Sequence, residues 1–384
     1  MEKERYRQLL VSLEKDAKTE ILKNGAAVEI RSCYDRRGGK MDPRTALASH
    51  AVREDFIRHP ERYDDELLAN ADRLFGPPQP ENYSALSQIR YTFGWRSSNL
   101  SSRVVSERHV LLSEHGPFSV WRYEIPGTGK SRPCILFIHG GAFVAGDIET
   151  VENQCKLLAQ LMDGVVFSVD YPLAPEHPYP VAFDDCKAVL EWVYSGADTF
   201  GIDRKRIGVA GDSAGGNLSA ALSVADRDEG KGRIGYQCLI YPKLSSALSS
   251  EEPYYYWKEE LYDNPDNDPM IRAQIGLTGK MSGEVNSWYL PEGTDRYTPH
   301  YCPIAAKCEG LPKTLLVTAE YDFLRAECDA YLGMLKTAGV DFRAIRYGGI
   351  FHGTFDRLGY APQVEDILRE IAKDMRALDS YSSK

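Results

Sequence analysis

The stretch IGVAGDSAGGNLSAALSVA, residues 207–225, contains the pattern that decides the fold. The apolar run Ile207–Ala210 predicts a buried strand, and the alanine- and leucine-rich residues after Asn217 predict a helix. Between them, the sequence Gly-Asp-Ser-Ala-Gly predicts a sharp strand-to-helix turn that lifts the side chain of Ser213 above the edge of a sheet. Only small neighbours fit such a turn, and the amides at the start of the helix point towards developing negative charge. Ser213 is therefore the candidate nucleophile.

Further strands and helices alternate on both sides of this motif. Apolar strands are predicted at Cys134–His139, Val165–Asp170, Gln237–Tyr241, Thr314–Thr318 and Phe342–Tyr347, and helices at Glu152–Met162, Ala182–Tyr194 and Val364–Leu378. Strands that alternate with helices of this length indicate a parallel sheet covered by helices on both faces. His109–Leu112 and Phe118–Tyr123 predict a strand pair that turns at Gly116-Pro117. The fold class is α/β.

A second glycine motif, His139-Gly140-Gly141-Ala142-Phe143, ends an earlier strand. An oxyanion needs preorganised donors about 2.7–3.1 Å from the developing charge, and glycines let backbone amides come that close. Gly140 and Gly141, together with the amide of Ala214, are the candidate donors of the oxyanion hole. His139 is interpreted as a structural hydrogen-bonding residue.

Ser213 requires a base and an acid that orients the base. His352 follows the strand Phe342–Tyr347 in a glycine-rich loop and lies downstream of the serine, which makes it the candidate base. For the acid, Asp322 lies just past the strand Thr314–Thr318, and Glu320 is its competitor.

Five motifs occur in an order that resembles the hormone-sensitive-lipase-like esterases, which are α/β-hydrolases. These motifs are HGGAF (139–143), DYPLAPEHPYP (170–180), GDSAGG (211–216), EYDFLRAE (320–327) and FHG (351–353). The resemblance implies an α/β-hydrolase fold with a mostly parallel sheet, Ser213 as nucleophile, His352 as base and Asp322 as its orienting acid. It also implies the oxyanion hole of Gly140, Gly141 and Ala214. Four residues depart from the family pattern, namely Ala142, Pro172, Phe323 and Ala326.

The family resemblance also implies a helical cap. Residues 1–75 are interpreted as helical from their apolar spacing, so residues 1–106 are expected to form an N-terminal helical cap region and residues 107–384 the catalytic domain. Residues 250–302 interrupt the alternation and are interpreted as an insertion that contributes to the cap or the pocket. Phe143, Tyr256 and Trp257 are candidates for substrate contact. For the aromatic cluster at 254–257, packing between cap and core is the favoured interpretation, and lining of an acyl pocket is the alternative.

Composition excludes several classes of function. The 384 residues carry a net charge of −10, which argues against binding of nucleic acid or anionic membranes. The charged N-terminus shows no secretory signal, and no apolar run is long enough to span a bilayer, so a cytoplasmic location is expected. Eight scattered cysteines show no metal-ligand spacing and are interpreted as reduced thiols, mostly in the core. No metal or other cofactor is expected.

The sequence therefore predicts a serine carboxylesterase for small-molecule esters with short acyl chains. Two alternatives stay open: an amidase or deacetylase of a specific metabolite, because triad chemistry does not select the leaving group, and a non-catalytic ligand receptor on the same scaffold. The strand Phe342–Tyr347 is interpreted as a candidate sheet edge, and the resemblance implies that homodimers form through it.

Overall fold

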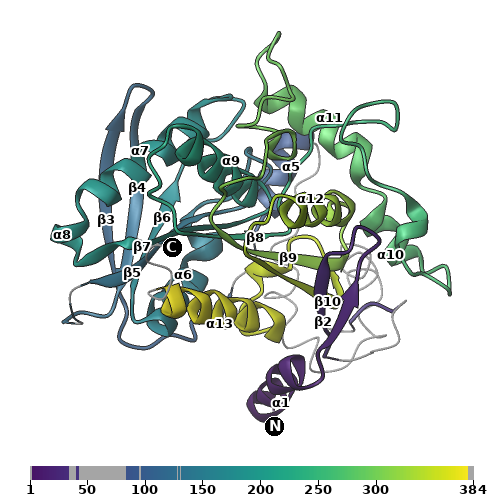
Figure 1. Cartoon of the computed structure of the whole chain (residues 1–384), viewed down its shortest axis with the longest axis horizontal. Helices are drawn as coiled ribbons and strands as arrows, with labels where there is room; N and C mark the ends of the chain where they lie inside the picture. The colour runs from purple at the N-terminus through teal and green to yellow at the C-terminus, as the bar shows by residue number, and fades with distance from the viewer. Residues whose placement is uncertain are drawn as a thin grey trace.

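A computed structural model describes residues 2–33, 40–42, 84–94, 97–127, 129 and 131–378. Within these residues, ten strands form one sheet in the order β1-β2-β10-β9-β8-β7-β5-β6-β4-β3 (Figure 1). The strands are β1 (Lys18–Ile21), β2 (Ala27–Arg31), β3 (Val105–Ser113), β4 (Gly116–Glu124), β5 (Arg132–Ile138), β6 (Val165–Asp170), β7 (Ile202–Asp212), β8 (Tyr236–Ile240), β9 (Lys313–Tyr321) and β10 (Phe342–Phe351). From β2 to β6 in this order the neighbours run parallel, and β1, β4 and β3 are antiparallel.

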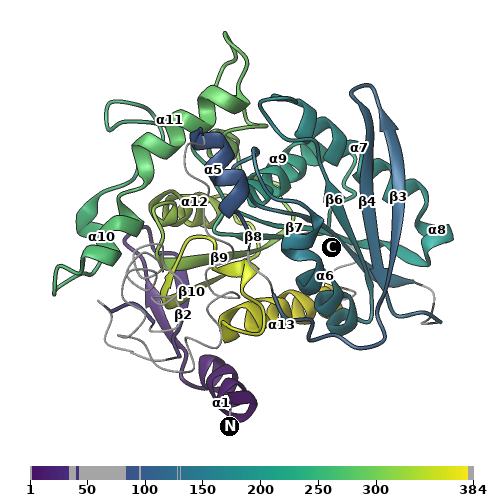
Figure 2. The ribbon, with the colours of Figure 1, turned by 180° about the vertical axis from the view of Figure 1, so that it is seen from behind.

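Helices cover both faces of the sheet, as predicted. They are α1 (Glu2–Lys15), α5 (Ala85–Thr92), α6 (Ile148–Met162), α7 (Val181–Ser195), α8 (Ala197–Phe200), α9 (Ala214–Asp228), α10 (Pro269–Ile275), α11 (Thr278–Tyr289), α12 (Arg325–Thr337) and α13 (Pro362–Ala377). Figures 1 and 2 show α6 and α13 on one side and α7, α9 and α12 on the other. Strand β5 is buried along its whole length because Ile135 and Phe137 pack towards α6 and α13, and Leu136 and Ile138 towards α7 and α9.

The order of the strands in the sheet changes direction between β5 and β7, because β6 and β7 lie on opposite sides of β5. From β5 the chain continues to β6 on one side, and it then returns to place β7 on the other side of β5. Ligands of open parallel sheets bind at such a switch point, beyond the carboxyl ends of the strands. Ile138 pairs with Gly211 in the β5–β7 register, so the glycine motif after β5 and the serine turn after β7 meet at this point.

The N-terminal region is not helical throughout, and the prediction is wrong for residues 18–31. This segment forms the hairpin β1–β2, and β2 extends the sheet beside β10. The spacing of its apolar residues is compatible with a strand as well as with a helix. In the structure, Ala26 and Val28 are buried against α12 and its neighbours. Helix α1 lies below α13 in Figure 1 and packs against it through Leu13. Residues 43–83 of the predicted cap lie outside the described residues. The division into cap and catalytic domain stays a prediction.

Strand β10 is not a sheet edge, which corrects a second expectation. Its parallel partner β2 covers the side turned away from β9, so the edges of the described sheet are β1 and β3. A dimer cannot form by strand pairing at β10, and whether the protein forms a homodimer by another route stays a prediction. Seven of the eight cysteines are buried and all are free thiols, as expected. No described helix is long and apolar enough to cross a membrane.

Candidate active site

Ser213 lies in the sharp turn between β7 and α9. Its backbone has φ 54° and ψ −114°, a strained conformation for a residue with a side chain, and its amide donates to the carbonyl of Ile240 at 2.9 Å. Glycine is required at position 215, because a Cβ there would lie 1.9 Å from the carbonyl oxygen of Ile138. The predicted strand-turn-helix arrangement is therefore present, and it holds Ser213 at the carboxyl edge of the sheet.

The register of two neighbouring strands places the other two predicted residues. Tyr321 on β9 pairs with Phe351 on β10, and each is the last residue of its strand, so Asp322 and His352 follow side by side. His352 Nε2 lies 2.8 Å from Ser213 Oγ, and His352 Nδ1 lies 2.8 Å from Asp322 Oδ2. The structure brings the three predicted catalytic residues into one hydrogen-bonded chain.

Burial and charge both affect the hydrogen-bonded residues Asp322 and His352. Asp322 is fully buried, and its second oxygen accepts from the amide of Leu324 at 2.8 Å. Burial works to lower the pKa of His352, but the charge and hydrogen bond of Asp322 outweigh it and raise the pKa above its ordinary value. The rings of Tyr241 and Phe323 pack 4.9 and 5.0 Å from the imidazole. The surroundings thus favour a histidine that can hold a proton taken from Ser213.

Glu320, the competing acid, has another role. Its Oε2 accepts from the amide of Gly349 at 2.7 Å, within the irregular stretch of β10 between Tyr347 and Phe351. The sequence placed the end of this strand at Tyr347, but the strand resumes after the bulge and continues to Phe351. Glu320 therefore braces the segment before His352 and does not orient the imidazole.

The assignment of Gly140 to the oxyanion hole requires correction. Its amide donates to Asp212 Oδ1 at 2.8 Å and is therefore already engaged. Among the described residues, the amides of Gly141 and Ala142 have no hydrogen-bond acceptor. Both residues have positive φ (124° and 55°), and Ala214 begins α9, where a helix leaves its first amides free. The free donors are Gly141, Ala142 and Ala214.

Asp212 is a residue whose role the sequence did not reveal. It is buried beside the Gly140 amide, and burial raises its pKa to about 7 against the opposing effect of that hydrogen bond. His139, by contrast, has the predicted structural position. It is fully buried, its ring stacks on Tyr171 at 4.3 Å, and burial lowers its pKa to about 4.

The comparisons with known proteins agree with this geometry. A family described as having the alpha/beta hydrolase fold matches residues 135–356. This chain belongs to the α/β-hydrolase family. The order of its motifs places it in the hormone-sensitive-lipase-like class.

Similar proteins of this family have esterase names. The chain is 36% identical over 233 residues to the esterase LipI of Mycobacterium tuberculosis, an alignment that covers 60% of this chain and 68% of LipI. It is 33% identical over 242 residues to an arylesterase of Saccharolobus solfataricus, covering 63% and 74% of the two chains. The structure of a hyperthermophilic esterase from Pyrobaculum calidifontis superposes with a TM-score of 0.65 at 30% identity, covering 88% of this chain and 99% of that one.

The hydrolase has a further anchor at its active-site edge that the sequence did not predict. Arg90 on α5 donates to the carbonyl of Val144, two residues after Ala142, at 2.7 Å. The same guanidinium donates to the carbonyl of Ala174 at 2.8 Å and to Glu176 at 2.8 Å. Arg90 thus connects a helix of the N-terminal region to the turn that follows β6 and to the glycine loop after β5 (residues 139–144), which we call the oxyanion loop.

The three aromatic candidates for substrate contact occupy different surroundings. Phe143 is fully buried, and its ring stacks on Tyr289 of α11 at 4.1 Å. Tyr256 is half-buried against the cluster around α12. Trp257 donates to the carbonyl of Ile275 at 2.9 Å and packs against the cluster that contains Phe351. Substrate contact stays a prediction for all three, and Phe143 has no exposed surface in this structure.

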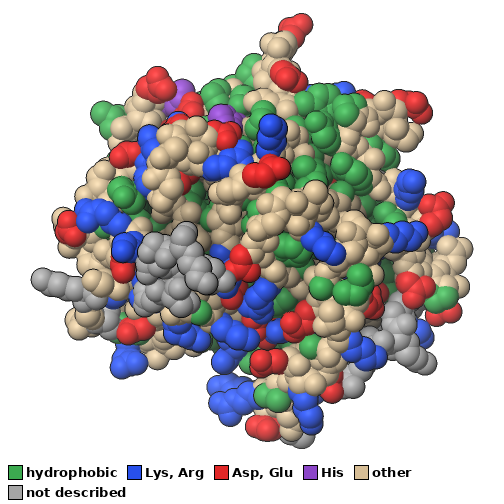
Figure 3. All heavy atoms as spheres, in the orientation of Figure 1, with side chains coloured by type: hydrophobic (Ala, Val, Ile, Leu, Met, Phe, Trp, Pro, Cys, Tyr) green, Lys and Arg blue, Asp and Glu red, His purple; other side chains and the backbone are tan. Residues whose placement is uncertain are grey.

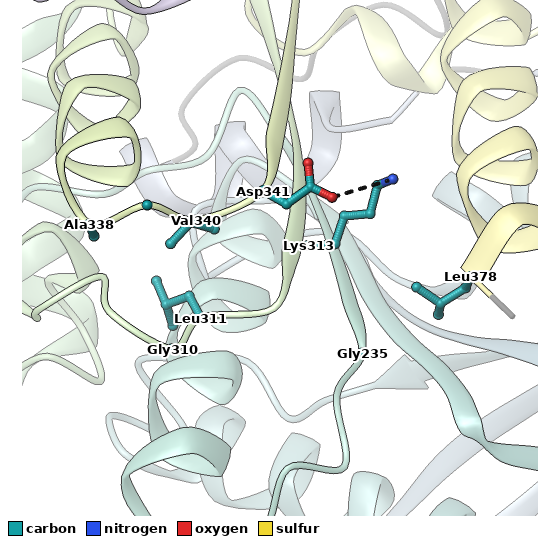
Figure 4. A pocket seen from close by; sticks show the side chains of 9 residues that line it. Gly235, Gly310, Leu311, Lys313, Ala338, Val340, Asp341 and Leu378 are labelled. Carbon is teal, nitrogen blue, oxygen red and sulfur yellow. Dashed lines mark ion pairs between the residues drawn. The ribbon is translucent and has the colours of Figure 1, made fainter. Parts of the chain in front are cut away.

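A hollow at the opposite edge of the sheet does not belong to this site. Figure 4 shows it, with a volume of about 220 Å³, beside Gly235, Lys313 and Asp341 at the amino ends of β8, β9 and β10. Ser213 and Asp322 follow the carboxyl ends of their strands. The candidate active site is therefore the edge where β5, β7, β9 and β10 end.

Proposed function

We propose that this chain, a carboxylic ester hydrolase, cleaves esters of short acyl chains through Ser213, His352 and Asp322. Ser213 Oγ attacks the ester carbonyl while His352 Nε2 takes its proton. Asp322 holds the imidazole in the required tautomer and stabilises the imidazolium. The protonated histidine then donates to the departing alcohol.

In this proposal the amides of Gly141, Ala142 and Ala214 donate hydrogen bonds to the oxyanion and stabilise its negative charge. Removing one donor from an oxyanion hole typically costs about 2.7–4 kcal/mol of transition-state stabilisation. Water then attacks the acyl-enzyme, again with His352 as base, and releases the acid. These steps use only groups of the protein and water.

The observation that carries the proposal is the continuous chain of two hydrogen bonds, each 2.8 Å long, from Ser213 Oγ through the imidazole to Asp322. A nucleophile within hydrogen-bonding distance of a base that a third group orients is the arrangement that acyl transfer requires. The raised pKa of His352 supports the role of proton acceptor.

The preference for short acyl chains is supported by the rings that pack behind the oxyanion loop. Phe143 stacks on Tyr289, and Tyr301 lies 5.8 Å from Phe143 and accepts from Asn217 of α9 through its carbonyl. We expect these packed rings to restrict the length of the acyl chain that can bind beside the serine turn. The substrate partner is accordingly a small-molecule ester.

A panel of p-nitrophenyl esters from acetyl to palmitoyl, run beside matched anilides, tests the proposal. We expect the highest kcat/KM with acetyl or butyryl esters, little anilide hydrolysis, and loss of turnover in Ser213→Ala. A maximum at octanoyl or longer would contradict the short-chain preference. Equal turnover of anilides would favour the amidase alternative, and no turnover of any substrate would favour the receptor alternative.

A further inference from the structure

The insertion between β8 and β9 reaches from the surface to the sheet beside the candidate active site. Figure 3 shows hydrophobic side chains at the upper right of the molecule, where Figure 1 places α11, and Leu261 and Leu277 of the insertion are exposed. By contrast, Tyr262 and Ile271 are buried. Residues 257–275, which contain these two buried side chains, are called the inner segment.

Buried side chains of the inner segment pack on the last residues of β9 and β10. Tyr262, Ile271 and Ile275 form one apolar cluster with Tyr321 and Phe351. Tyr321 and Phe351 stand immediately before the proposed orienting acid and the proposed base. Burial of apolar surface is favourable and holds the inner segment against both strand ends. The insertion therefore contacts β9 and β10 at the points where two residues of the proposed triad follow.

A hydroxyl of the inner segment contacts the orienting acid directly. Tyr262 Oη donates to the backbone carbonyl of Asp322 at 2.8 Å. The same carbonyl accepts from the amide of Arg325 at 3.0 Å, and Asp322 Oδ1 accepts from the amide of Leu324 at 2.8 Å. Of these three donors, only the Tyr262 hydroxyl comes from another part of the chain. It is therefore the contact through which the insertion acts on Asp322.

The side chain of Arg325 also connects the inner segment to the turn that contains the acid. Its guanidinium donates to the carbonyl of Glu320 at 2.8 Å and to the carbonyl of Leu261. It lies 4.2 Å from the centre of the Tyr262 ring, where a cation is attracted by the negative face of the ring. Arg325 thus holds Tyr262 in the position from which its hydroxyl reaches the acid.

We propose that Tyr262 is a positioning residue for Asp322, and that the inner segment holds this acid in the orientation that the imidazole requires. The inference rests on the proposed function, because it concerns how the acid of that triad is placed. Displacement of a catalytic group by about 1 Å can lower a rate by about 100-fold. The insertion thus contributes to turnover without contact with the reacting atoms.

Tyr262→Phe tests this role, since it removes only the hydroxyl and keeps the ring in the apolar cluster. We expect kcat for p-nitrophenyl acetate to fall by about 5–10-fold with KM within about twofold, because the hydroxyl contacts the acid and not the substrate. Tyr297→Phe is the matched control. It removes a hydroxyl that lies 3.1 Å from Glu252 in the same insertion, and it should leave kcat unchanged.

The pH profile separates positioning of the acid from a general loss of stability. Burial lowers the pKa of His352, and the carboxylates of Asp322, Asp212 and Glu327 raise it. Tyr262→Phe removes none of these charges, but a displaced Asp322 raises the pKa less. The midpoint of the acid limb of kcat/KM should therefore move to lower pH by about 0.3 of a pH unit or more in Tyr262→Phe. It should stay in place in Tyr297→Phe.

Ser213→Ala, measured beside these variants, distinguishes the inference from the proposed function. Loss of turnover in Ser213→Ala with wild-type kcat and an unmoved midpoint in Tyr262→Phe would overturn the inference alone. A lower kcat in Tyr262→Phe with an unmoved midpoint, or equal changes in Tyr297→Phe, would indicate a merely structural role and would also overturn it. Turnover retained in Ser213→Ala would overturn the proposed function and this inference with it.

Discussion

The amide of Gly140 donates to Asp212 Oδ1 at 2.8 Å, across 72 residues of sequence. This contact joins the glycine loop after β5 to the residue that precedes the nucleophile. It also fixes which amides of the loop remain free, because Gly140 is engaged while Gly141 and Ala142 are not. We therefore propose that Asp212 acts through Gly140 as a positioning residue for the proposed oxyanion hole.

Substitution of Asp212 should separate the effect of its negative charge from the effect of its hydrogen bond to Gly140. Asp212→Ala leaves the Gly140 amide without its acceptor, and we expect kcat to fall by about 10–100-fold with little change in KM, because displaced donors weaken only the transition state. Asp212→Asn keeps an oxygen that can accept and should stay within a few-fold of the wild type. Equal loss in both variants would show that the charge matters and the hydrogen bond does not.

The pH dependence of hydrolysis follows from His352. The base must be neutral to accept the proton, and Asp322 raises its pKa above the ordinary 6.5 despite burial. Activity should therefore fall as pH drops through a midpoint above 6.5. Asp322→Asn removes the charge that raises this pKa, so the midpoint should move to lower pH while kcat falls by about 10⁴-fold. Profiles of kcat/KM between about pH 5 and pH 9 report this, and a midpoint unmoved in the variant would refute it.

Arg90 is expected to position the oxyanion loop from outside. Arg90→Gln removes the donors to the carbonyls of Val144 and Ala174, and we expect kcat to fall by about tenfold while the Tm changes little. Arg204→Gln, which breaks an exposed ion pair with Asp198, is the control and should leave kcat unchanged. Wild-type kcat in Arg90→Gln would mean that the anchor does not support catalysis.

The N-terminal hairpin should contribute to global stability. Arg31 on β2 is 1% exposed and lies 2.7 Å from Asp366 and 3.1 Å from Glu370 on α13. Arg31→Ala leaves Asp366 buried without its cation, while Glu370 keeps Arg343. Removing one partner of a buried ion pair typically costs about 3–5 kcal/mol. Urea unfolding should show a lower midpoint, and an unchanged midpoint would indicate that the hairpin is separable from the core.

The proposed catalytic residues could be selected from the sequence because each follows a predicted strand, and the family resemblance favoured Asp322 over Glu320. Ser213, Asp322 and His352 are marked by apolar runs that stop at glycine or loop residues, and a parallel sheet brings such ends together. The donor set could not be predicted in full, since the engagement of Gly140 depends on a tertiary contact with Asp212.

The other features that could not be predicted from the sequence also have physical reasons. Residues 18–31 form short strands whose apolar spacing is compatible with a helix, and β10, the strand with which β2 pairs, lies more than 300 residues away in sequence. No local sequence pattern marks Arg90, because its proposed role depends on hydrogen bonds to the distant carbonyls of Val144 and Ala174.

The most direct test of the proposed catalytic role is the site of covalent labelling by a fluorophosphonate, read by mass spectrometry of the digested protein. Such a reagent reacts with a serine that a neighbouring base activates. We expect one adduct per chain, on the peptide that contains Ser213, and none in Ser213→Ala whose circular dichroism matches the wild type. An adduct on another residue, or none on wild-type protein that hydrolyses esters, would contradict the assignment of Ser213 as the nucleophile.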